Sequence, residues 1–487
     1  MDVSILLILL LTGAIATYLS GDKLASKVAL IFSVAALVIT LMLVNMHAQG
    51  QSLDFAQVWV TNPKIFFALS GDGLALAMLL LTTGLLPIII YSSFGSTYNN
   101  AKTFYGLIMF MAFAMAGTFL ASDGFLYYIF WELSLIPIYF IALVWGNGDA
   151  ESRKKAVLKF FIYTLAGSLF MLVGFVYLFQ KTGSFLLTDL VKASLSETEQ
   201  TWIFFAFFLA YAIKIPLIPF HTWQAKVYQK APFVGTILLS GIMLKMGLYS
   251  IIRWQLPIAP FAARHYMTIL ITLGIAGVIY GSIVALRQKN LKRLLAYSSL
   301  AHVGLIAAGA YTLTIDGFRG AVLQMVAHGF VVTGLFIVAE IIERRYNTQE
   351  IAEMGGIRSQ APKLTSFFLI LVMASVALPT TFNFVAEFMV LFSLSQINMW
   401  FAVLGGSTII LGAYYMLKMF QNSMLGETNT KLFADVTFSE GTSLVLIVGV
   451  LLFFGFYPKP LLELITPSLE QILAGINNLD QLKQTVQ

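Results

Sequence analysis

The sequence predicts an all-α polytopic membrane protein with about 14 transmembrane helices. Hydrophobic residues occupy 59% of the 487 positions, charged residues only 11%, and the mean hydropathy is +0.85. A soluble chain of this length would normally carry a charge at roughly a quarter of its positions. The apolar residues also form runs of about 20, the length at which an α-helix crosses the hydrocarbon core of a membrane. Composition and run length together exclude a soluble globular fold.

Apolar runs of spanning length occur fourteen times along the chain. The expected crossings are 3–20, 25–46, 73–92, 104–121, 123–145, 156–180, 201–220, 233–253, 266–286, 294–313, 319–343, 364–395, 397–420 and 441–458. The first run lacks the basic start and the cleavage pattern of a signal peptide, so we expect it to remain as a transmembrane helix. The tail from Pro460 mixes polar and apolar residues, which favours an amphipathic segment at an interface.

Lysine and arginine are distributed unevenly between the two sets of loops. One set holds 19 of the 29 basic residues and the other holds 8, which leaves Lys214 and Lys245 inside the membrane. Basic loops stay in the cytoplasm, so the larger set, which includes Lys292 and Lys431, is predicted to be cytoplasmic. The smaller set, which includes Lys483, is then outside, and an even number of crossings places both termini there. The net charge of +6 is therefore a topology signal and no sign of nucleic-acid binding.

Cysteine is absent from the sequence. Its absence excludes disulfides and also excludes iron–sulfur clusters or zinc ions held by cysteines of this chain. The histidines do not have the HExxH-type spacing of a zinc site, so no metal site is expected. We expect no redox centre on this chain.

A lysine followed by two prolines interrupts the seventh expected crossing. Lys214 precedes Pro216 and Pro219. Proline has no N–H, so the carbonyls of Ala212 and Ile215 are expected to lose their usual helical donors. Broken helices at membrane depth persist only where protein or water satisfies such groups. Lys214 is therefore expected either to cap these carbonyls or to take part in an ion path, and the two roles are compatible.

Two further charged residues lie near the middle of expected crossings. Lys245 is in the eighth crossing between two glycines, too far from either end for its ammonium to reach the interface easily. Glu132 is at the centre of the fifth, where a neutral carboxyl that fixes helix packing is the alternative. A charged side chain in hydrocarbon costs about 2.5–3.5 kcal/mol on insertion scales, so such residues usually mark ion or proton paths. Because burial disfavours the charged form of both groups, an adjacent Glu and Lys can exchange a proton at modest cost.

Two histidines and a glutamate extend this set into the second half of the chain. His302 is in the tenth crossing and His328 in the eleventh. Histidine titrates near neutral pH and can pass a proton between its ring nitrogens, although either could be a hydrogen-bonded core residue. Glu387 lies eight residues beyond Pro379, on the second half of another broken helix. His221 is near a boundary and is expected to be structural.

Four other carboxylates lie close to the ends of crossings, where we expect interfacial or loop-pairing roles: Asp72, Asp123, Glu340 and Glu343.

A faint internal repeat relates the two halves of the chain. The letters Lys-Ala-Val-Leu open the sixth crossing at residue 155, and Gly-Ala-Val-Leu opens the eleventh at residue 320. The seventh crossing is broken at Pro216 and the twelfth at Pro379. Units five crossings apart lie in opposite orientations, which is the plan of many transporters. We expect a single membrane domain with N-terminal helices at 1–103, repeats at 104–253 and 266–420, and a last helix with an amphipathic tail at 441–487.

Five segments carry a resemblance to a known family. They are AIKIPLIPFHTW from residue 212, SGIMLKMGLY from 240, NLKRLLAYSSLAHVG from 290, QMVAHG from 324 and FNFVAEFMVLF from 382. In this order they resemble the antiporter-like membrane subunits of respiratory complex I, the NADH–quinone oxidoreductase, over roughly residues 71–425. At the position of Glu387, the sibling subunits of this family carry lysine, whereas the type called M in bacteria and chain 4 in mitochondria carries glutamate. In this residue the chain resembles the M type.

The resemblance implies a fold, a site and partners. The fold has two inverted five-helix repeats, helices 4–8 and 9–13, with helices 7 and 12 broken. The implied site is a Glu–Lys–Lys–His–Glu polar axis made of Glu132 paired with Lys214, then Lys245, His302, His328 and Glu387. No cofactor is expected on this chain, because FMN, iron–sulfur clusters and quinone belong to partner subunits. Its neighbours would be other antiporter-like and membrane-arm subunits in the lipid bilayer of the bacterial inner membrane.

The implied function is proton translocation coupled to quinone reduction, by a subunit of the oxidoreductase that has no redox centre of its own. A subunit of a multi-subunit sodium/proton antiporter, a hydrogenase-type or photosynthetic-type relative with another electron donor, and a spacer without transport remain open alternatives. The buried charges argue against a spacer. Two stretches depart from the family. The usual Leu-Pro-Asp-Ala-His segment is absent after His221, and the glycine-rich segment before helix 12 reads Ala377-Leu378-Pro379-Thr380-Thr381.

Overall fold

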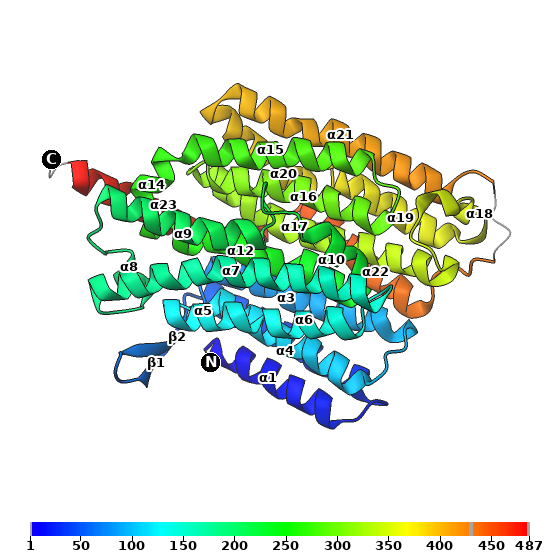
Figure 1. Cartoon of the computed structure of the whole chain (residues 1–487), viewed down its shortest axis with the longest axis horizontal. Helices are drawn as coiled ribbons and strands as arrows, with labels where there is room; N and C mark the ends of the chain where they lie inside the picture. The colour runs from blue at the N-terminus through cyan, green and yellow to red at the C-terminus, as the bar shows by residue number, and fades with distance from the viewer. Residues whose placement is uncertain (1, 428–431, 485–487) are drawn as a thin grey trace.

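The protein is an almost entirely helical bundle in which the long helices run along the longest dimension of the molecule (Figure 1). The computed structural model describes residues 2–427 and 432–484, and the side chains as far as residue 478. In this part of the chain, 10 helices are long and apolar enough to cross a membrane, and three more apolar helices are shorter. The prediction of an all-α polytopic membrane protein is confirmed, and the count of fourteen crossings stays a prediction.

The first half of the chain contains a hairpin and the helices that surround Lys214. Its elements are α1 (Ser4–Leu19), α2 (Ala25–Ala48), β1 (Phe55–Val60), β2 (Ile65–Leu69), α3 (Gly73–Ser92), α4 (Ala101–Leu120), α5 (Gly124–Leu133), α6 (Leu135–Val144), α7 (Ala150–Thr182), α8 (Leu187–Leu190), α9 (Glu197–Lys214), α10 (Gln224–Lys230), α11 (Phe233–Ile237), α12 (Leu244–Ser250) and α13 (Leu256–Ile258). Two π-helical turns, Leu238–Met243 and Ile251–Gln255, join α11, α12 and α13 into one continuous rod.

The second half holds the remaining helices. They are α14 (Pro260–His265), α15 (Met267–Leu286), α16 (Leu291–Ala310), α17 (Ile315–Tyr346), α18 (Ile357–Gln360), α19 (Pro362–Ser375), α20 (Phe382–Ile397), α21 (Met399–Met424), α22 (Phe438–Phe456) and α23 (Lys459–Gln484). Each expected crossing coincides with one helix or with a broken pair. The expected amphipathic tail is α23, which lies on the protein: Ser468 accepts from Gly73 N–H at 3.0 Å, and Arg319 donates to Glu470 at 3.0 Å.

The two ends of the bundle carry different elements. The start of α1, the β-hairpin, α8 and α14 lie at one end, on the left in Figure 1, and α18 lies at the opposite end. We call these the hairpin end and the α18 end. The hairpin was not expected, since its strands are short and lie in a loop between crossings. Asp123, at the start of α5, accepts a hydrogen bond from Phe66 N–H at 3.2 Å and so ties the hairpin to the bundle.

Helix lengths support the expected repeat. Helices α4 and α15 both have 20 residues, and α7 and α17 have 33 and 32. The distance along the sequence between corresponding helix starts is also nearly the same in the two pairs. Helix α15 starts 166 positions after α4, and α17 starts 165 positions after α7. Two copies of one unit would give such spacing. The repeat boundaries and their inverted orientation remain predictions.

Both broken helices end in the same way. Leu217 N–H donates to the Ala212 carbonyl at 2.8 Å beyond α9, and Leu378 N–H donates to the Met373 carbonyl at 3.0 Å beyond α19. Each bond spans five residues and closes the helix with a wide final turn. The Ala212 carbonyl thus loses its usual donor at Pro216, as expected, and the Leu217 N–H, one residue further along the chain, replaces it.

The positions of three basic residues bear on the predicted orientation. Lys292, counted among the loop lysines, instead lies in the first turn of α16, where it is 1% exposed and lies 2.5 Å from the Glu343 carboxylate. Its loop assignment is wrong, since a buried ammonium with an ion-pair partner is part of the packed bundle. Lys431 and the side chain of Lys483 lie outside the described residues.

Candidate functional site

Lys245 and His328 are the centre of a buried polar line. The Lys245 ammonium lies 2.9 Å from His328 Nδ1 and donates to the Ser240 carbonyl at 2.6 Å. Lys245 is fully buried and His328 is 2% exposed. An ammonium has only donors, so the ring nitrogen that faces it must accept. The contact therefore lets a proton move from the lysine to the histidine.

The first π-helical turn explains how Lys245 obtains its carbonyl partner. The Leu244 N–H donates to the Leu239 carbonyl, five residues back. The Ser240 carbonyl accepts from the Lys245 side chain instead. Such wide turns are frequent at functional sites, because they free a backbone group at a chosen depth in a helix. They also aim the ammonium toward the start of this helical rod, which is at the α18 end.

His302 and Glu387 continue the line. The Nδ1 atom of His302 lies 3.0 Å from Oε1 of Glu387, and the rings of His302 and His328 have centroids 5.7 Å apart at 54°. The same carboxylate oxygen accepts from Gln324 Nε2 at 3.0 Å. The exposed fractions are 5% for His302 and 2% for Glu387, so the surrounding protein shields these groups from solvent.

The order of the line is Lys245, His328, His302, Glu387, from four helices: α12, α17, α16 and α20. The structure thus brings together four of the six residues singled out from the sequence. Within this group only the step between the two histidines lacks a direct hydrogen bond.

Glu132 and Lys214 lie in the first half of the bundle and are not in direct contact. Lys214 Nζ lies 3.3 Å from the Ser134 hydroxyl and 4.7 Å from the centre of the Trp131 ring. Ser134 is at the junction between α5 and α6, so it offers the hydroxyl where the helix is interrupted. In residues 2–427 and 432–484 no ion pair within 4.0 Å joins Glu132 to Lys214, although each charge acts on the other. One oxygen of Glu132, Oε1, is without a hydrogen-bond partner there.

Apolar packing separates Lys214 from Lys245. A Cβ atom at Gly247 would lie 2.5 Å from Ile215 Cγ1, so the residue after Lys214 fits directly against the glycine that follows Lys245. Beside Lys214, the Tyr211 hydroxyl and the Trp131 indole N–H are buried and have no partner in the described part of the chain. The two groups of predicted residues are therefore close but not connected by hydrogen bonds.

The sequence contained signals for two polar residues that were missed. Gln324 comes four residues before His328, and Asn383 comes four before Glu387, so each shares a helix face with a predicted residue. Asn383 is 1% exposed, and neither amide atom has a partner among the described residues. Both residues could have been found in the sequence as polar residues one helical turn away from a buried titratable residue.

The carboxylates near the ends of crossings act as caps and ion-pair partners. Asp72 accepts from Ala75 N–H at the start of α3 and pairs with Arg253. Burial alone would raise the pKa of Asp72, but the Arg253 guanidinium and these hydrogen bonds hold it below its usual value. Asp123 caps α5. His221 packs against the Tyr280 ring, with centroids 4.9 Å apart, away from the polar line.

No group of three or more histidine, aspartate or glutamate side chains gathers as a metal site within the described ranges. The lysine, histidine and glutamate side chains of the polar line are titratable groups, which can accept and release protons.

A helical membrane bundle with broken helices and a buried line of lysine, histidine and glutamate defines the antiporter-like class of membrane proteins. The family model described as NADH:quinone oxidoreductase/Mrp antiporter, TM, matches residues 121–412. The chain belongs to this family.

Known proteins resemble the chain over nearly its whole length. NADH-quinone oxidoreductase subunit M of Rickettsia prowazekii (strain Madrid E) is 35% identical over 93% of this chain and 93% of its own. A chain in the structure of respiratory complex I from Thermus thermophilus with bound NADH aligns with a TM-score of 0.90 at 27% identity, covering 97% of this chain and 99% of that one. A chain of the Mrp complex from Dietzia sp. DQ12-45-1b shares the fold, with a TM-score of 0.84 at 19% identity over 96% and 97% of the two chains.

Proposed function

We propose that this chain is a proton-translocating membrane subunit of an NADH:quinone oxidoreductase (complex I), of the subunit M type. The buried contact series from Lys245 through His328 and His302 to Glu387 carries this proposal. The 35% identity of this chain to a subunit M, over 93% of its length, supports the assignment to that type. Quinone reduction would take place on partner subunits, and this chain would supply only the proton path.

The proposed path begins at Glu132 and Lys214. A charge change in a neighbouring subunit would act on this loosely associated pair. Among the described residues, Lys214 has a hydroxyl and an aromatic face as its close partners. At an effective interior dielectric, a unit charge about 4 Å away contributes about 4 kcal/mol, which is roughly a thousandfold in a protonation equilibrium. Such a change is large enough to drive a proton from Lys214 toward Lys245.

The step from Lys214 to Lys245 needs water or a side-chain movement, because no hydrogen bond connects them. The unpartnered hydroxyl of Tyr211 and indole N–H of Trp131 would hold such water beside Lys214. Protonated Lys245 would then pass its proton to His328 Nδ1, and the imidazolium would release one from its other ring nitrogen toward His302. Glu387 would receive it and deliver it to one face of the membrane.

The remaining assignments follow from this proposal. FMN, iron–sulfur clusters and quinone would be held by partner subunits, and other antiporter-like and membrane-arm subunits would be the neighbours. The chain would lie in the bacterial inner membrane with both termini outside, so that the α18 end faces the cytoplasm. Residues 104–253 and 266–420 would form the two inverted repeats.

Proton pumping by membranes that carry Lys214→Ala tests the proposal. Loss of NADH-driven pumping together with slower NADH–quinone electron transfer is expected, because the two are coupled in the proposed complex. Pumping at the wild-type proton-to-electron ratio would overturn the role of Lys214.

A sodium/proton antiporter subunit is the second candidate, favoured by the shared fold of the Mrp complex chain. The two functions separate cleanly in membranes. An antiporter would exchange sodium for protons without NADH or quinone, and Lys214→Ala would then abolish this exchange while NADH oxidation continued unchanged.

A further inference from the structure

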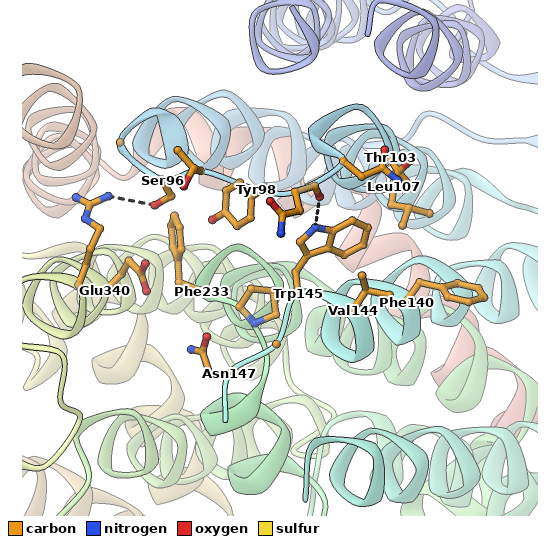
Figure 2. Close-up of a pocket in the computed structure, with 17 residues that line it drawn as sticks. Ser96, Tyr98, Thr103, Leu107, Phe140, Val144, Trp145, Asn147, Phe233 and Glu340 are labelled. Carbon is orange, nitrogen blue, oxygen red and sulfur yellow. Dashed lines mark hydrogen bonds between the residues drawn. The ribbon is translucent and has the colours of Figure 1, made fainter. Parts of the chain in front are cut away.

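A cavity of about 980 Å³ opens at the α18 end, separate from the polar line. Its walls are the segment 95–100, the ends of α4 and α6 that lie at the α18 end, Pro232 with Phe233, and the last turns of α17. None of the six proposed path residues lines it. The cavity is polar at one end and apolar at the other, as Figure 2 shows: Glu340 and Ser96 lie at one end, and Leu107, Phe140 and Val144 lie at the other.

The apolar end of the cavity opens on the exposed side of two candidate membrane spans. Phe140 is 46% exposed and Val144 is 56% exposed, and both belong to the candidate membrane span Gly124–Val144. Leu107 belongs to the span Ala101–Leu120. Between the two ends, the Trp145 indole N–H donates to the Asn99 carbonyl at 2.7 Å. Tryptophan is typical of the level of the lipid headgroups, so the cavity opens sideways into the bilayer at this level.

The polar end holds the Glu340 carboxylate, for which no ion pair within 4.0 Å is present among the described residues, although Lys292 and Arg344 lie near enough to act on it. Three cations and three carboxylates meet there: Lys292, Arg344, Arg345, Glu340, Glu343 and Glu440. Glu343 pairs with Lys292 at 2.5 Å, and Glu440 accepts from both arginines. Glu340 has no ion pair within 4.0 Å in the described part of the chain. Arg344 also donates to the Ser96 hydroxyl at 3.1 Å, which places guanidinium and hydroxyl donors beside this carboxylate.

We propose that this cavity binds a zwitterionic phospholipid whose headgroup carries a primary ammonium, such as phosphatidylethanolamine. Its ammonium pairs with Glu340, and its phosphate accepts from the Arg344 guanidinium beside Ser96. Its acyl chains leave along Phe140, Val144 and Leu107.

The charges at the polar end of the cavity and the apolar residues at its opening favour a zwitterionic phospholipid over an anionic lipid or a small soluble molecule. A purely anionic headgroup would bring its negative charge to Glu340 and leave the carboxylate still without an ion-pair partner. A small soluble zwitterion would fill the polar end but would leave the apolar mouth unused. This site goes beyond the proposed function and does not depend on it.

Lipid binding to the purified, delipidated full chain in detergent tests the proposal. Native mass spectrometry with added dioleoyl phosphatidylethanolamine or dioleoyl phosphatidylglycerol measures both affinities. We expect phosphatidylethanolamine to bind about tenfold tighter, and Glu340→Gln to remove this preference. Glu151→Gln is the matched control, since Glu151 is 77% exposed and lies outside the cavity. Equal affinity of the two lipids for the wild type would overturn the proposal.

A second variant tests the mouth of the cavity without changing its charges. Val144→Trp should fold, because Val144 is more than half exposed, and should exclude the acyl chains and lower phosphatidylethanolamine binding about tenfold. Unchanged binding by Val144→Trp or by Glu340→Gln would overturn the site. Two outcomes in the assembled complex would do so as well. One is slower proton pumping by Glu340→Gln with unchanged lipid retention, which would indicate that the cavity holds water that conducts protons and does not bind lipid. The other is absence of co-purified phosphatidylethanolamine.

Discussion

Lys245 reaches His328 by way of a π-helical turn: its ammonium donates to the Ser240 carbonyl at 2.6 Å and lies 2.9 Å from the imidazole. The turn frees that carbonyl and aims the lysine at α17, where small residues allow close approach. A Cβ atom at Gly241 would lie 3.1 Å from Thr333 Oγ1, which leaves little room for any larger residue. Backbone geometry therefore sets the first step of the proposed path.

Gln324→Ala should slow proton pumping roughly tenfold while the complex still assembles. Gln324 donates one of the two hydrogen bonds to Oε1 of Glu387, and a hydrogen bond to a charged group contributes about 1.5–3 kcal/mol. Gln324 is a positioning residue in this account. Pumping rates in sealed membrane vesicles measure the effect, with Gln288→Ala in the loop after α15 as the control. Wild-type pumping by Gln324→Ala would show that this amide has no role in the path.

Gly304→Ala should destabilise the protein by about 1–3 kcal/mol, the usual effect of overpacking. A Cβ atom there would lie 2.5 Å from the Gly274 carbonyl oxygen, so α15 and α16 would have to move apart. Gly449→Ala in α22 is the control, because nothing lies within 4 Å of its added Cβ. Thermal unfolding in detergent compares the two, and equal midpoints would contradict the close glycine contact.

The sequence was sufficient to predict the fold class, because the hydrocarbon core of a membrane permits few backbone structures. Backbone groups in hydrocarbon must bond within the segment, so each apolar run of spanning length becomes a helix. The β-hairpin and α8 were missed for the converse reason: they lie in loops, where neither length nor periodicity constrains the chain. Lys292 was assigned to a loop because it lies just before an expected crossing. The sequence does not show that Glu343, 51 residues further on, pairs with it inside the bundle.

The site was predictable residue by residue but not in its connections. Titratable residues are rare within apolar crossings, and this identified Lys245, His302, His328 and Glu387 as candidates. The structure brings these four together. The order expected from the resemblance had His302 before His328, whereas the contacts place His328 next to Lys245. The order depends on how α12, α16, α17 and α20 pack against one another, which the sequence does not show. The same limit hid the separation of Lys214 from Lys245 by Ile215 packed on Gly247.

Asp72→Asn should make stability less dependent on pH in the acid range. Arg253 keeps the pKa of Asp72 below its value of about 3.9 in an unfolded chain, so the carboxylate stabilises the fold above about pH 4. This contribution is lost as the pH falls through the lowered pKa of the folded state. The wild type should therefore be more stable than Asp72→Asn at pH 7, and the difference should shrink below about pH 4. Thermal unfolding as a function of pH measures it, with Asp189→Asn as the control; a difference that grows in acid would contradict this assignment.

The proton-to-electron ratio of Lys245→Arg tests the central claim most directly. Arginine keeps the positive charge but does not release a proton at physiological pH, so it preserves the electrostatics and removes the transfer. NADH-driven proton uptake and NADH oxidation are measured together in sealed membrane vesicles, with Lys226→Arg in α10 as the control. The account predicts that Lys245→Arg pumps at least tenfold less than the control. Pumping at the wild-type ratio would show that Lys245 passes no proton to His328, and the proposed path would be wrong.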